Sequence, residues 1–318
     1  MADGSGYKRA RRTKAPRVSM SSGNLTADRR FAYGQMLREN GDAAGAAEVI
    51  AQALELAPAW AEGRFALAET LAESGRTDAA SAEYRAYLVL DPADSMGASI
   101  RLALLGSDTP PATVPEAYVR RLFDEYAPRF DKSLVDRLAY RAPEALRAAV
   151  GAIPTGRKYT ATLDLGCGTG LAGAAFRSMT EWLEGVDLSP RMVGEARRKK
   201  IYDHLAVGDM SEHLRAATRH FDLVVAADVL VYVGALDDIF RAVRGKTTDD
   251  GVFAFTVQRH DGEDFMLGTE HRYRHGRNYI AACATANGFA VARLDDGVFR
   301  HEGGADVPGL LAVLRPLA

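Results

Sequence analysis

The chain has 318 residues, a formal net charge of −2, 47% hydrophobic residues and 26% charged residues. This length predicts two domains, and the composition is that of a globular protein able to bury a sizeable core. The balanced charge excludes a surface that is basic throughout, so nucleic acid is not an expected partner. No apolar run reaches the length of a membrane span, which predicts a cytoplasmic protein without membrane contact. Two cysteines are too few for a disulfide framework, and no metal site is predicted.

Residues 1–24 differ from the rest of the chain in charge. The segment 1–20 contains six lysines and arginines against Asp3 alone, a local excess of five positive charges. Such a segment is compatible with a targeting peptide or a nucleic-acid arm, but chain ends are commonly solvated and disordered. We therefore predict a disordered basic tail over 1–24.

Residues 25–106 are rich in alanine, leucine and glutamate at helical spacing. A pattern in this region recurs at the offset that separates Pro58 from Pro92. The same offset relates the pairs Tyr33/Leu67, Gly34/Ala68, Leu37/Leu71, Ala46/Ala80, Ile50/Tyr84 and Ala53/Tyr87. Such a period, about 34 residues long, predicts helix–turn–helix repeats that pack closely at the small residues, with a capping helix over 95–105.

This period and its pattern of small residues resemble the tetratricopeptide repeat (TPR). The resemblance implies an all-α domain that binds a protein or a second copy of the chain. The match is incomplete, because Arg30 and Arg64 occupy the position where the repeat has its first tryptophan. Alanine-rich helical hairpins produce a similar pattern, so that alternative stays open.

Residues 107–116 contain three prolines, which forbid a continuous helix, and we predict a linker and the domain boundary there. A second domain is predicted over 117–318. It begins with helices over 117–150, where Phe123, Tyr126 and Phe130 recur at nearly helical spacing.

Residues 159–165 form an apolar run, and a glycine-rich turn and a helix-forming run follow at once. This combination can cradle a nucleotide, because glycines permit close backbone approach and a helix start offers free N–H groups. The spacing Gly168-x-Gly170-x-x-Gly173 also fits a dinucleotide fingerprint, which makes NAD an alternative ligand. Asp164 argues against NAD, because its negative charge would face the pyrophosphate and suits a cationic ligand better.

The motif Asp164-x-Gly166-x-Gly168-x-Gly170 resembles motif I of the class I S-adenosylmethionine (SAM) methyltransferases. With the repeats, it makes the chain after residue 30 similar to the predicted TPR-containing methyltransferases of bacteria. The resemblance implies SAM as the cofactor. It also implies an α/β domain with a Rossmann-like sheet of seven strands, the last antiparallel, joined to an N-terminal all-α TPR domain.

The cofactor-binding residues follow from these motifs. The three glycines would pass under the methionine part of SAM, and Asp164 would favour its cationic amino acid end. Asp187, followed by Leu188, can accept hydrogen bonds from both ribose hydroxyls, and Asp209 can accept one from the adenine amino group. The complete predicted set is Asp164, Gly166, Gly168, Gly170, Asp187, Leu188, Asp209, Met210 and Asp228.

Apolar runs after the glycine turn alternate with helical patterns, as a parallel doubly wound sheet requires. The predicted strands are 182–186, 205–207, 221–226, 252–257, 289–294 and 310–314. In the family that the chain resembles, the last two strands are commonly an antiparallel pair.

Three residues are candidates for catalysis. Asp228 follows the strand 221–226, where it could orient the acceptor or act as a base, and capping the next helix is an equal alternative. His275 is a candidate base because an ordinary histidine exchanges protons near neutral pH; a surface or capping role is the alternative. Tyr126 lies in a segment that resembles the lid over the cofactor in methyltransferases, and an amphipathic helix with core aromatics is its alternative.

The sequence therefore predicts an enzyme that transfers a methyl group from SAM to an oxygen or nitrogen atom of a small-molecule metabolite. One alternative is a protein or peptide methyltransferase whose repeats hold the target. A second is a SAM-binding scaffold without activity, and a third is an NAD-dependent dehydrogenase. Arg272, Arg274 and Arg277 could bind an anionic acceptor or face water.

Overall fold

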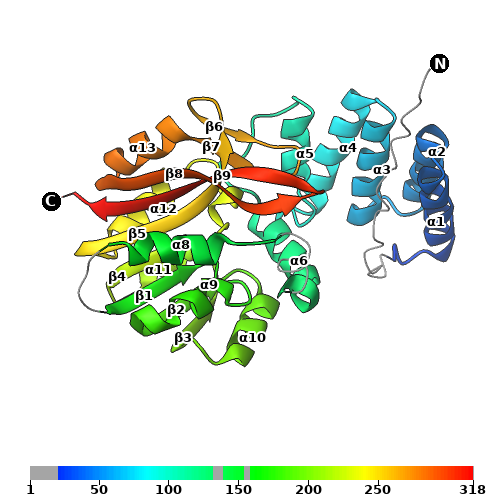
Figure 1. Ribbon diagram of the computed structural model, residues 1–318. Coiled ribbons are helices and arrows are strands. Elements are labelled where there is room, and N and C mark those ends of the chain that lie inside the picture. Colours follow the sequence, from blue (N-terminus) through cyan, green and yellow to red (C-terminus); the bar gives the residue numbers. More distant parts are fainter. Residues whose placement is uncertain (1–20, 132–138, 154–157, 318) are drawn as a thin grey trace, which may run out of the picture. The chain divides into compact units, whose positions relative to one another are not determined.

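The computed structural model describes residues 21–131, 139–153 and 158–317 (Figure 1). The chain divides into two compact units, Met1–Leu90 and Asp91–Ala318. This boundary precedes the predicted one at 106. Most of the predicted basic tail (1–20) and part of the predicted lid region (132–138) lie outside the described residues.

The first unit contains two helical hairpins, formed by α1 (Leu25–Glu39), α2 (Ala43–Leu56), α3 (Ala61–Glu73) and α4 (Thr77–Leu90). The Asn24 side chain accepts hydrogen bonds from Thr26 N and Ala27 N, and the Asp42 side chain accepts one from Gly45 N, so α1 and α2 begin at capping residues. Both ends of α4 follow those of α2 at the offset that separates Pro92 from Pro58, in agreement with the sequence period. The predicted helical repeats are therefore present.

Small residues let the helices of the first unit pack closely. A Cβ atom added at Gly34 of α1 would lie 2.7 Å from Ile50 Cγ1 of α2. Ala46 and Ala80 are fully buried at equivalent positions of the two hairpins. Phe31 packs on Trp60 with 4.6 Å between ring centroids, so aromatic contacts join consecutive hairpins.

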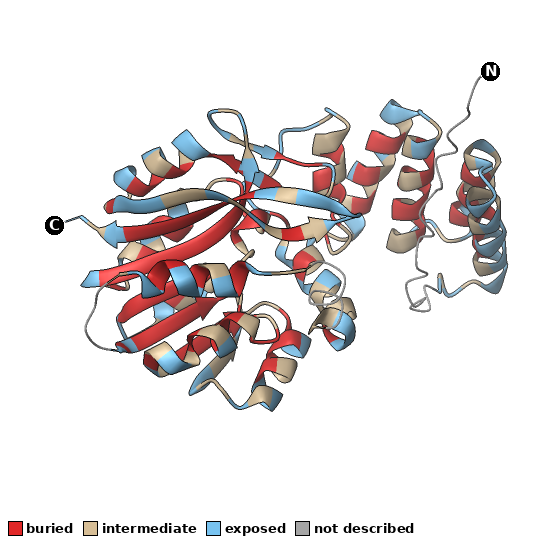
Figure 2. Ribbon diagram, viewed as in Figure 1, coloured by how far each residue is buried: buried red, intermediate tan, exposed pale blue. Residues whose placement is uncertain are grey.

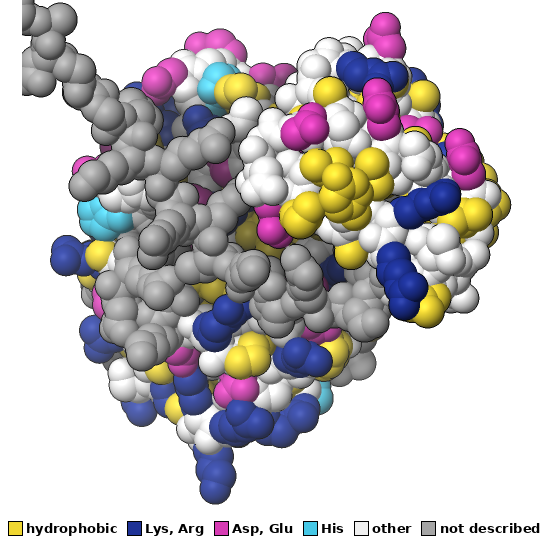
Figure 3. Space-filling view, turned by 90° about the vertical axis from the view of Figure 1, so that its right-hand side faces the viewer, with side chains coloured by type: hydrophobic (Ala, Val, Ile, Leu, Met, Phe, Trp, Pro, Cys, Tyr) yellow, Lys and Arg dark blue, Asp and Glu magenta, His cyan; other side chains and the backbone are white. Residues whose placement is uncertain are grey.

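The surface of this unit is partly apolar. Leu25, Tyr33, Met36 and Val89 are exposed, Val89 by 79%. Figure 3 shows hydrophobic side chains gathered on the face turned to the viewer, with acidic and basic side chains around them. Among the described residues, no helix has both the length and the apolar character needed to cross a membrane.

The second unit begins with two segments that we predicted to lie outside it, the capping helix of the repeats and the linker. Helix α5 (Ala98–Leu104), predicted as a cap for the repeats, buries Ile100 in a cluster with Val114, Val119 and Tyr273. The predicted linker 107–116 is anchored, because Val114 N donates to Tyr232 O at 2.8 Å. A buried valine and a backbone hydrogen bond attach these residues to the second unit, which explains the earlier boundary.

The remaining helical elements of the second unit are α6 (Glu116–Tyr126), η1 (Ala127–Arg129), α8 (Ala142–Gly151), α9 (Leu171–Phe176), η2 (Arg177–Met179), α10 (Pro190–Lys199), α11 (Met210–Ala216), η3 (Leu230–Tyr232), α12 (Asp237–Arg244) and α13 (Arg277–Ala286). Its strands are β1 (Tyr159–Leu165), β2 (Thr180–Asp187), β3 (His204–Val207), β4 (Phe221–Ala226), β5 (Thr247–His260), β6 (Phe265–Leu267), β7 (Tyr273–Gly276), β8 (Phe289–Glu302) and β9 (Ala305–Pro316).

The strands form one mixed sheet. Strands β3, β2, β1, β4 and β5 are neighbours in that order and run parallel. Strand β9 pairs antiparallel with β5, and β8 pairs antiparallel with β9. The predicted Rossmann-like sheet with an antiparallel last strand is confirmed.

The predicted count of seven strands is wrong, since nine strands form within the described residues. The two additional strands, β6 and β7, form a hairpin that pairs with β5 beyond its contact with β9. Their sequence is polar and aromatic without a clear alternation, so the sequence pattern did not predict these strands. Backbone pairing to the exposed end of β5 holds them in the sheet.

Helices cover both faces of the sheet, and the alternating strand residues form two separate cores (Figures 1 and 2). On one face, Phe240 of α12 and Ile280 of α13 pack against Phe253 and Phe255 of β5. On the other face, residues of α8 and α9 pack against the intervening strand residues, such as Ala254. The central strands β1 and β4 are almost entirely buried, which leaves their ends for a ligand.

The packing at Gly34 leads to a stability prediction. Gly34→Leu should destabilise the first unit by about 1–3 kcal/mol, because the added side chain has no room beside Ile50. Arg29→Leu adds the same side chain to the exposed side of α1 and serves as the control. Thermal unfolding followed by circular dichroism should show a lower melting temperature for Gly34→Leu alone; equal temperatures would contradict the close packing.

Candidate functional site

The carboxyl ends of β1, β2, β3 and β4 meet at one edge of the sheet, where open α/β sheets bind ligands. The glycine-rich turn follows β1 at this edge. Gly166, Gly168 and Gly170 have φ values of 63°, 54° and 90°, a region that side chains other than glycine rarely adopt. Among the described residues, a Cβ atom added at Gly168 would meet Phe130 alone, at 3.8 Å, so these residues leave room for a ligand at this point of the turn.

The glycines also make room for Tyr202, which the sequence did not single out. A Cβ atom at Gly173 would lie 2.2 Å from the Tyr202 hydroxyl, and one at Gly170 would lie 3.0 Å from its ring. The Tyr202 hydroxyl donates a hydrogen bond to Asp164 Oδ2 at 2.6 Å. The motif therefore accommodates both the turn and the aromatic ring that holds its acidic residue.

Asp164 is fully buried at the end of β1. Its Oδ2 atom accepts from Tyr202, while its buried Oδ1 atom has no hydrogen-bonding partner among the described residues. Burial raises the pKa of this carboxyl group to about 7, because the charged form has lost water. A buried acceptor atom without a partner is costly, and a cationic ligand would satisfy it. These properties fit the ammonium end of SAM.

Asp187 lies at the end of β2, one strand away. Its Oδ2 atom accepts from Gly168 N at 2.9 Å and its Oδ1 atom accepts from Ser189 N at 2.8 Å. Burial raises its pKa to about 6, partly offset by these hydrogen bonds. Each carboxylate oxygen can accept a second hydrogen bond, so the predicted contacts with ribose hydroxyls remain feasible. Leu188 is half-buried and packs against the apolar cluster that contains Val119.

Asp209 and Met210 lie where β3 leads into α11. Asp209 is the N-cap of this helix, since its Oδ1 atom accepts from Ser211 N and Glu212 N, both at 2.9 Å. Met210 packs against the core on that face of the sheet. The contact of Asp209 with adenine stays a prediction, and it would have to use the carboxylate oxygen that does not cap the helix.

The segment that resembles a lid contacts the glycine turn. Thr169 Oγ1 donates a hydrogen bond to Asp131, and Lys199 Nζ forms an ion pair with the same carboxylate at 2.7 Å. Tyr126 packs edge-to-face on Phe130, with 5.5 Å between ring centroids, and Phe130 lies beside Gly168. The structure thus brings Tyr126 near the predicted cofactor site through Phe130. Its catalytic role stays a prediction.

Asp228 follows β4 in a left-handed backbone conformation, with φ of 57°. Its backbone N–H donates to Thr256 Oγ1 at 2.9 Å, and its Oδ2 atom accepts from Arg300 Nη1 at 2.5 Å. Arg300 is only 8% exposed, so this is a largely buried ion pair. Within the described part of the chain, the Asp228 side chain caps no helix. Arg300 of β8 instead holds the side chain at the edge of the sheet, and Thr256 of β5 holds the backbone.

Two neighbours of Asp228 were missed in the sequence. Arg300 lies on β8, far from Asp228 in the chain, in a strand whose alternation reveals nothing about this contact. Tyr140 donates from its hydroxyl to Ala227 O at 3.3 Å, and burial together with the negative charges of Asp228 and Asp164 raises its pKa. Tyr140 is therefore close enough to both Asp228 and Asp164 to feel their charges.

The structure contradicts a role of His275 as an exposed base. His275 lies on β7, two residues before α13, and is fully buried. Its Nε2–H group faces two carbonyl oxygens, Val233 O at 2.9 Å and Gly234 O at 3.1 Å. Burial lowers its pKa to about 4, so the ring is neutral at physiological pH. Its position in the core prevents contact with an acceptor.

The arginines after β5 are engaged in ion pairs. Arg272 pairs with Glu302 at 2.9 Å, Arg274 with Glu270 at 2.9 Å and Arg277 with Asp296 at 2.6 Å. Their positive charge is therefore balanced within the protein, which does not favour an anion-binding cluster.

Comparisons with known proteins agree with this geometry. Residues 162–251 match the family model described as a methyltransferase domain. The malonyl-[acyl-carrier protein] O-methyltransferase of Enterobacter lignolyticus is 30% identical over 144 residues, which cover 45% of this chain and 55% of the relative. Human methyltransferase-like protein 27 is 35% identical over 119 residues, which cover 36% of this chain and 46% of that relative. The chain thus spans about half the length of these curated relatives.

A solved structure supports the fold. The 1,6-didemethyltoxoflavin-N1-methyltransferase of Burkholderia thailandensis, solved with bound 1,6-didemethyltoxoflavin and S-adenosylhomocysteine, has a TM-score of 0.51 at 20% identity. The match covers 65% of this chain and 92% of that chain. With the motif geometry and the family match, it follows that the second unit contains a class I SAM-dependent methyltransferase domain. The cofactor of this domain is SAM.

The buried state of Asp164 predicts a pH dependence of SAM binding. The ionised carboxylate attracts the ammonium group, so binding should be tightest above the Asp164 pKa of about 7. Below that value a proton must be removed first, and the affinity should fall by up to about tenfold per pH unit. Calorimetric titration between pH 6 and 8 measures this. Asp164→Asn should bind SAM weakly with a flatter profile; an unchanged profile would contradict the role of Asp164.

The environment of His275 predicts a second pH effect. The folded-state pKa of about 4 lies below the ordinary histidine value of 6.5, so the unfolded chain binds more protons at acid pH. Stability should therefore fall as the pH decreases from about 6.5 to about 4, by about 3 kcal/mol from this group. His275→Gln should lack this share of the acid destabilisation in urea unfolding at several pH values. Parallel curves for the two proteins would show that the ring is not held neutral.

Proposed function

We propose that the protein transfers a methyl group from SAM to an oxygen or nitrogen atom of a small molecule. The observation that carries this proposal is Asp164, a buried carboxylate under a glycine turn with one oxygen that lacks a partner among the described residues. We assign Asp164, Gly166, Gly168, Gly170, Asp187, Leu188, Asp209, Met210 and Asp228 to the cofactor site. Asp164 would neutralise the ammonium group, and Asp187 would orient the ribose.

SAM supplies a methyl group on a cationic sulfur, so an acceptor lone pair forms the new bond while the carbon–sulfur pair of electrons stays on sulfur. The protein's part is to orient the acceptor and to take its proton. Asp228 is suited to this, because Arg300 and Thr256 fix its side chain and backbone. The proton released by the acceptor would pass to Asp228 or to water. Tyr126 and Phe130 would exclude water from the cofactor side.

The choice of a small molecule is supported by relatives. The Burkholderia enzyme was solved with bound 1,6-didemethyltoxoflavin, and the Enterobacter relative is named for a malonyl group on a carrier protein. These substrates are those of the two related proteins. For this chain, a small acceptor is the assignment that agrees with the contacts of the segment 116–131 at the sheet edge, where Asp131 accepts from Thr169 and Asp124 from Ser189.

A role of the first unit in holding a protein target is the second candidate. The regular spacing of α2 and α4 and the exposed Tyr33 and Met36 favour a TPR-like surface that binds a protein or a second copy. In that case the acceptor would be a side chain of the bound protein. A cytoplasmic location is part of both proposals.

Calorimetric titration with SAM, S-adenosylhomocysteine and NAD tests the cofactor assignment. The wild type should bind the first two with micromolar affinity, and Asp187→Ala should lose at least about tenfold because it removes two ribose hydrogen bonds. Asp238→Ala is the control, since this carboxylate is 80% exposed on α12. Binding of NAD in preference to SAM, or equal loss in both variants, would contradict the proposal.

A further inference from the structure

A row of aromatic rings leads from the glycine turn to the loop after β4. Phe130 lies beside Gly168 of the turn, at 3.8 Å from a Cβ atom added there. Phe123 of α6 packs on Phe130 with 6.0 Å between ring centroids, and Tyr232 packs on Phe123 at 5.6 Å. Tyr232 belongs to η3, which follows Asp228 in the chain. We refer to Phe130, Phe123 and Tyr232 as the aromatic row.

The aromatic row differs from the aromatic residues of the core. Phe240 and Phe253 also pack edge-to-face on each other, but both are fully buried. Each ring of the aromatic row is only half-buried. Phe123 and Tyr232 pack against the apolar cluster that contains Val119, and the part of each ring that stays exposed can contact a ligand. Ligand sites are commonly lined by such aromatic side chains with a few polar groups beside them.

Asp228 supplies a polar group at the end of the aromatic row. Burial and, as a smaller cause, the charge of Asp228 raise the pKa of Tyr232, so the two side chains lie close together. Arg300 binds Asp228 Oδ2, and Thr256 binds the backbone N–H. The Oδ1 atom makes no hydrogen bond with the described residues, and the side chain is 19% exposed. This oxygen can therefore accept a hydrogen bond from a ligand while Arg300 holds the carboxylate in place.

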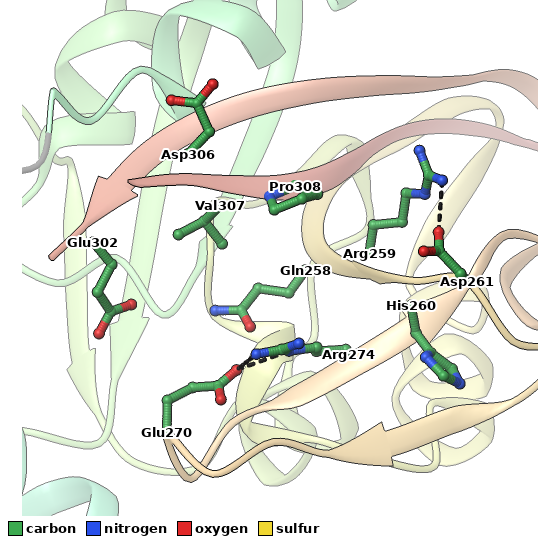
Figure 4. A pocket seen from close by; sticks show the side chains of 10 residues that line it. All are labelled: Gln258, Arg259, His260, Asp261, Glu270, Arg274, Glu302, Asp306, Val307 and Pro308. Atoms are coloured by element: carbon green, nitrogen blue, oxygen red, sulfur yellow. Dashed lines mark hydrogen bonds and ion pairs between the residues drawn. The ribbon is translucent and has the colours of Figure 1, made fainter. Parts of the chain in front are cut away.

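The charges around Arg300 compensate one another. Its Nη2 atom forms an ion pair with Glu302 at 3.5 Å, and Glu302 also pairs with Arg272 at 2.9 Å. Glu302 lines a cavity of about 880 Å³ beside the end of β5 (Figure 4). The other carboxylates of this wall are paired as well: Glu270 with Arg274, Asp261 with Arg259 and Asp306 with His301. This balance favours an uncharged ligand over an ammonium ion or an anion.

We propose that the methyl acceptor is an uncharged aromatic compound with a hydroxyl group on its ring. The ring would pack on the aromatic row, and the hydroxyl would donate a hydrogen bond to Asp228 Oδ1. This inference rests on the proposed methyltransferase function and narrows it to the oxygen of one class of acceptor. A ring hydroxyl suits a carboxylate base, because its pKa is about 10, against about 16 for water.

The transfer balances with the residues of this site. The hydroxyl oxygen forms the bond to the methyl carbon, and the electron pair of the carbon–sulfur bond stays on sulfur. The products are a methyl ether and S-adenosylhomocysteine. The hydroxyl proton passes to Asp228 Oδ1 and from there to water.

Calorimetric titration of the full chain saturated with S-adenosylhomocysteine tests this proposal with three probes. 4-Methylphenol and 4-methylcyclohexanol have the same carbon skeleton and differ in aromaticity, while 4-hydroxybenzoate has a carboxylate in place of the methyl group. 4-Methylphenol should bind about fivefold more tightly than either of the others, the effect of one good aromatic contact. Phe123→Leu should remove the preference over 4-methylcyclohexanol, whose own affinity should not change.

Tyr118→Leu is the matched control, because it removes another half-buried ring from α6, one that contacts His271 and lies outside the aromatic row. This variant should bind the three probes like the wild type. Thermal unfolding of both variants separates loss of binding from loss of fold. With labelled SAM, the wild type should methylate 4-methylphenol, and Asp228→Asn should bind it similarly but transfer the methyl group at least about 100-fold more slowly.

Four results would overturn the inference: equal binding of 4-methylphenol and 4-methylcyclohexanol, tightest binding of 4-hydroxybenzoate, no binding or methylation of 4-methylphenol, or equal effects of Phe123→Leu and Tyr118→Leu. Undiminished transfer by Asp228→Asn would contradict the role of this carboxylate. Failure of S-adenosylhomocysteine to bind would instead contradict the proposed function.

Discussion

The second unit depends on a carboxylate that is buried before any ligand arrives. Asp164 ends the central strand of the sheet and is held from one side by the Tyr202 hydroxyl. Burying a charge without a full set of partners is unfavourable, and the raised pKa expresses that cost. The surrounding glycines keep the backbone in left-handed conformations and leave space for the tyrosine ring. A cationic cofactor would offset the cost of burying the Asp164 carboxylate. The same buried charge therefore accounts for both the unfavourable burial and the preference for a cationic ligand.

A second buried charge organises the edge of the sheet after β4. Arg300 reaches from a long terminal hairpin to Asp228 and Glu302, and thereby links the edge of the parallel sheet to elements added beyond it. The β6–β7 hairpin is another such element, paired with the end of β5. In the proposed function, the parallel strands hold SAM, and the terminal hairpin fixes Asp228, which would orient the acceptor. This division would let one cofactor site serve different acceptors.

The first unit is built on a different principle. Its helices associate through small residues such as Gly34 and through aromatic contacts such as that of Phe31 with Trp60. The capping helix assigned to it from the sequence belongs to the second unit, because Ile100 packs there with Val114. Its exposed apolar residues are the basis for the proposed protein-binding surface.

The sequence by itself determined the helical period, the five parallel strands and the glycine turn with Asp164 and Asp187, because each of these depends on local spacing. The antiparallel pair was implied by the family resemblance alone. Only the tertiary structure decided the β6–β7 hairpin, the burial of His275 and the partners of Asp228. Strand pairing brings together residues that are distant in the chain, and a local sequence pattern does not predict which residues pair. Arg300 and Asp228 are 72 positions apart, and His275 resembles a base until the core encloses it. Side chains acquire their chemistry from neighbours that the fold supplies.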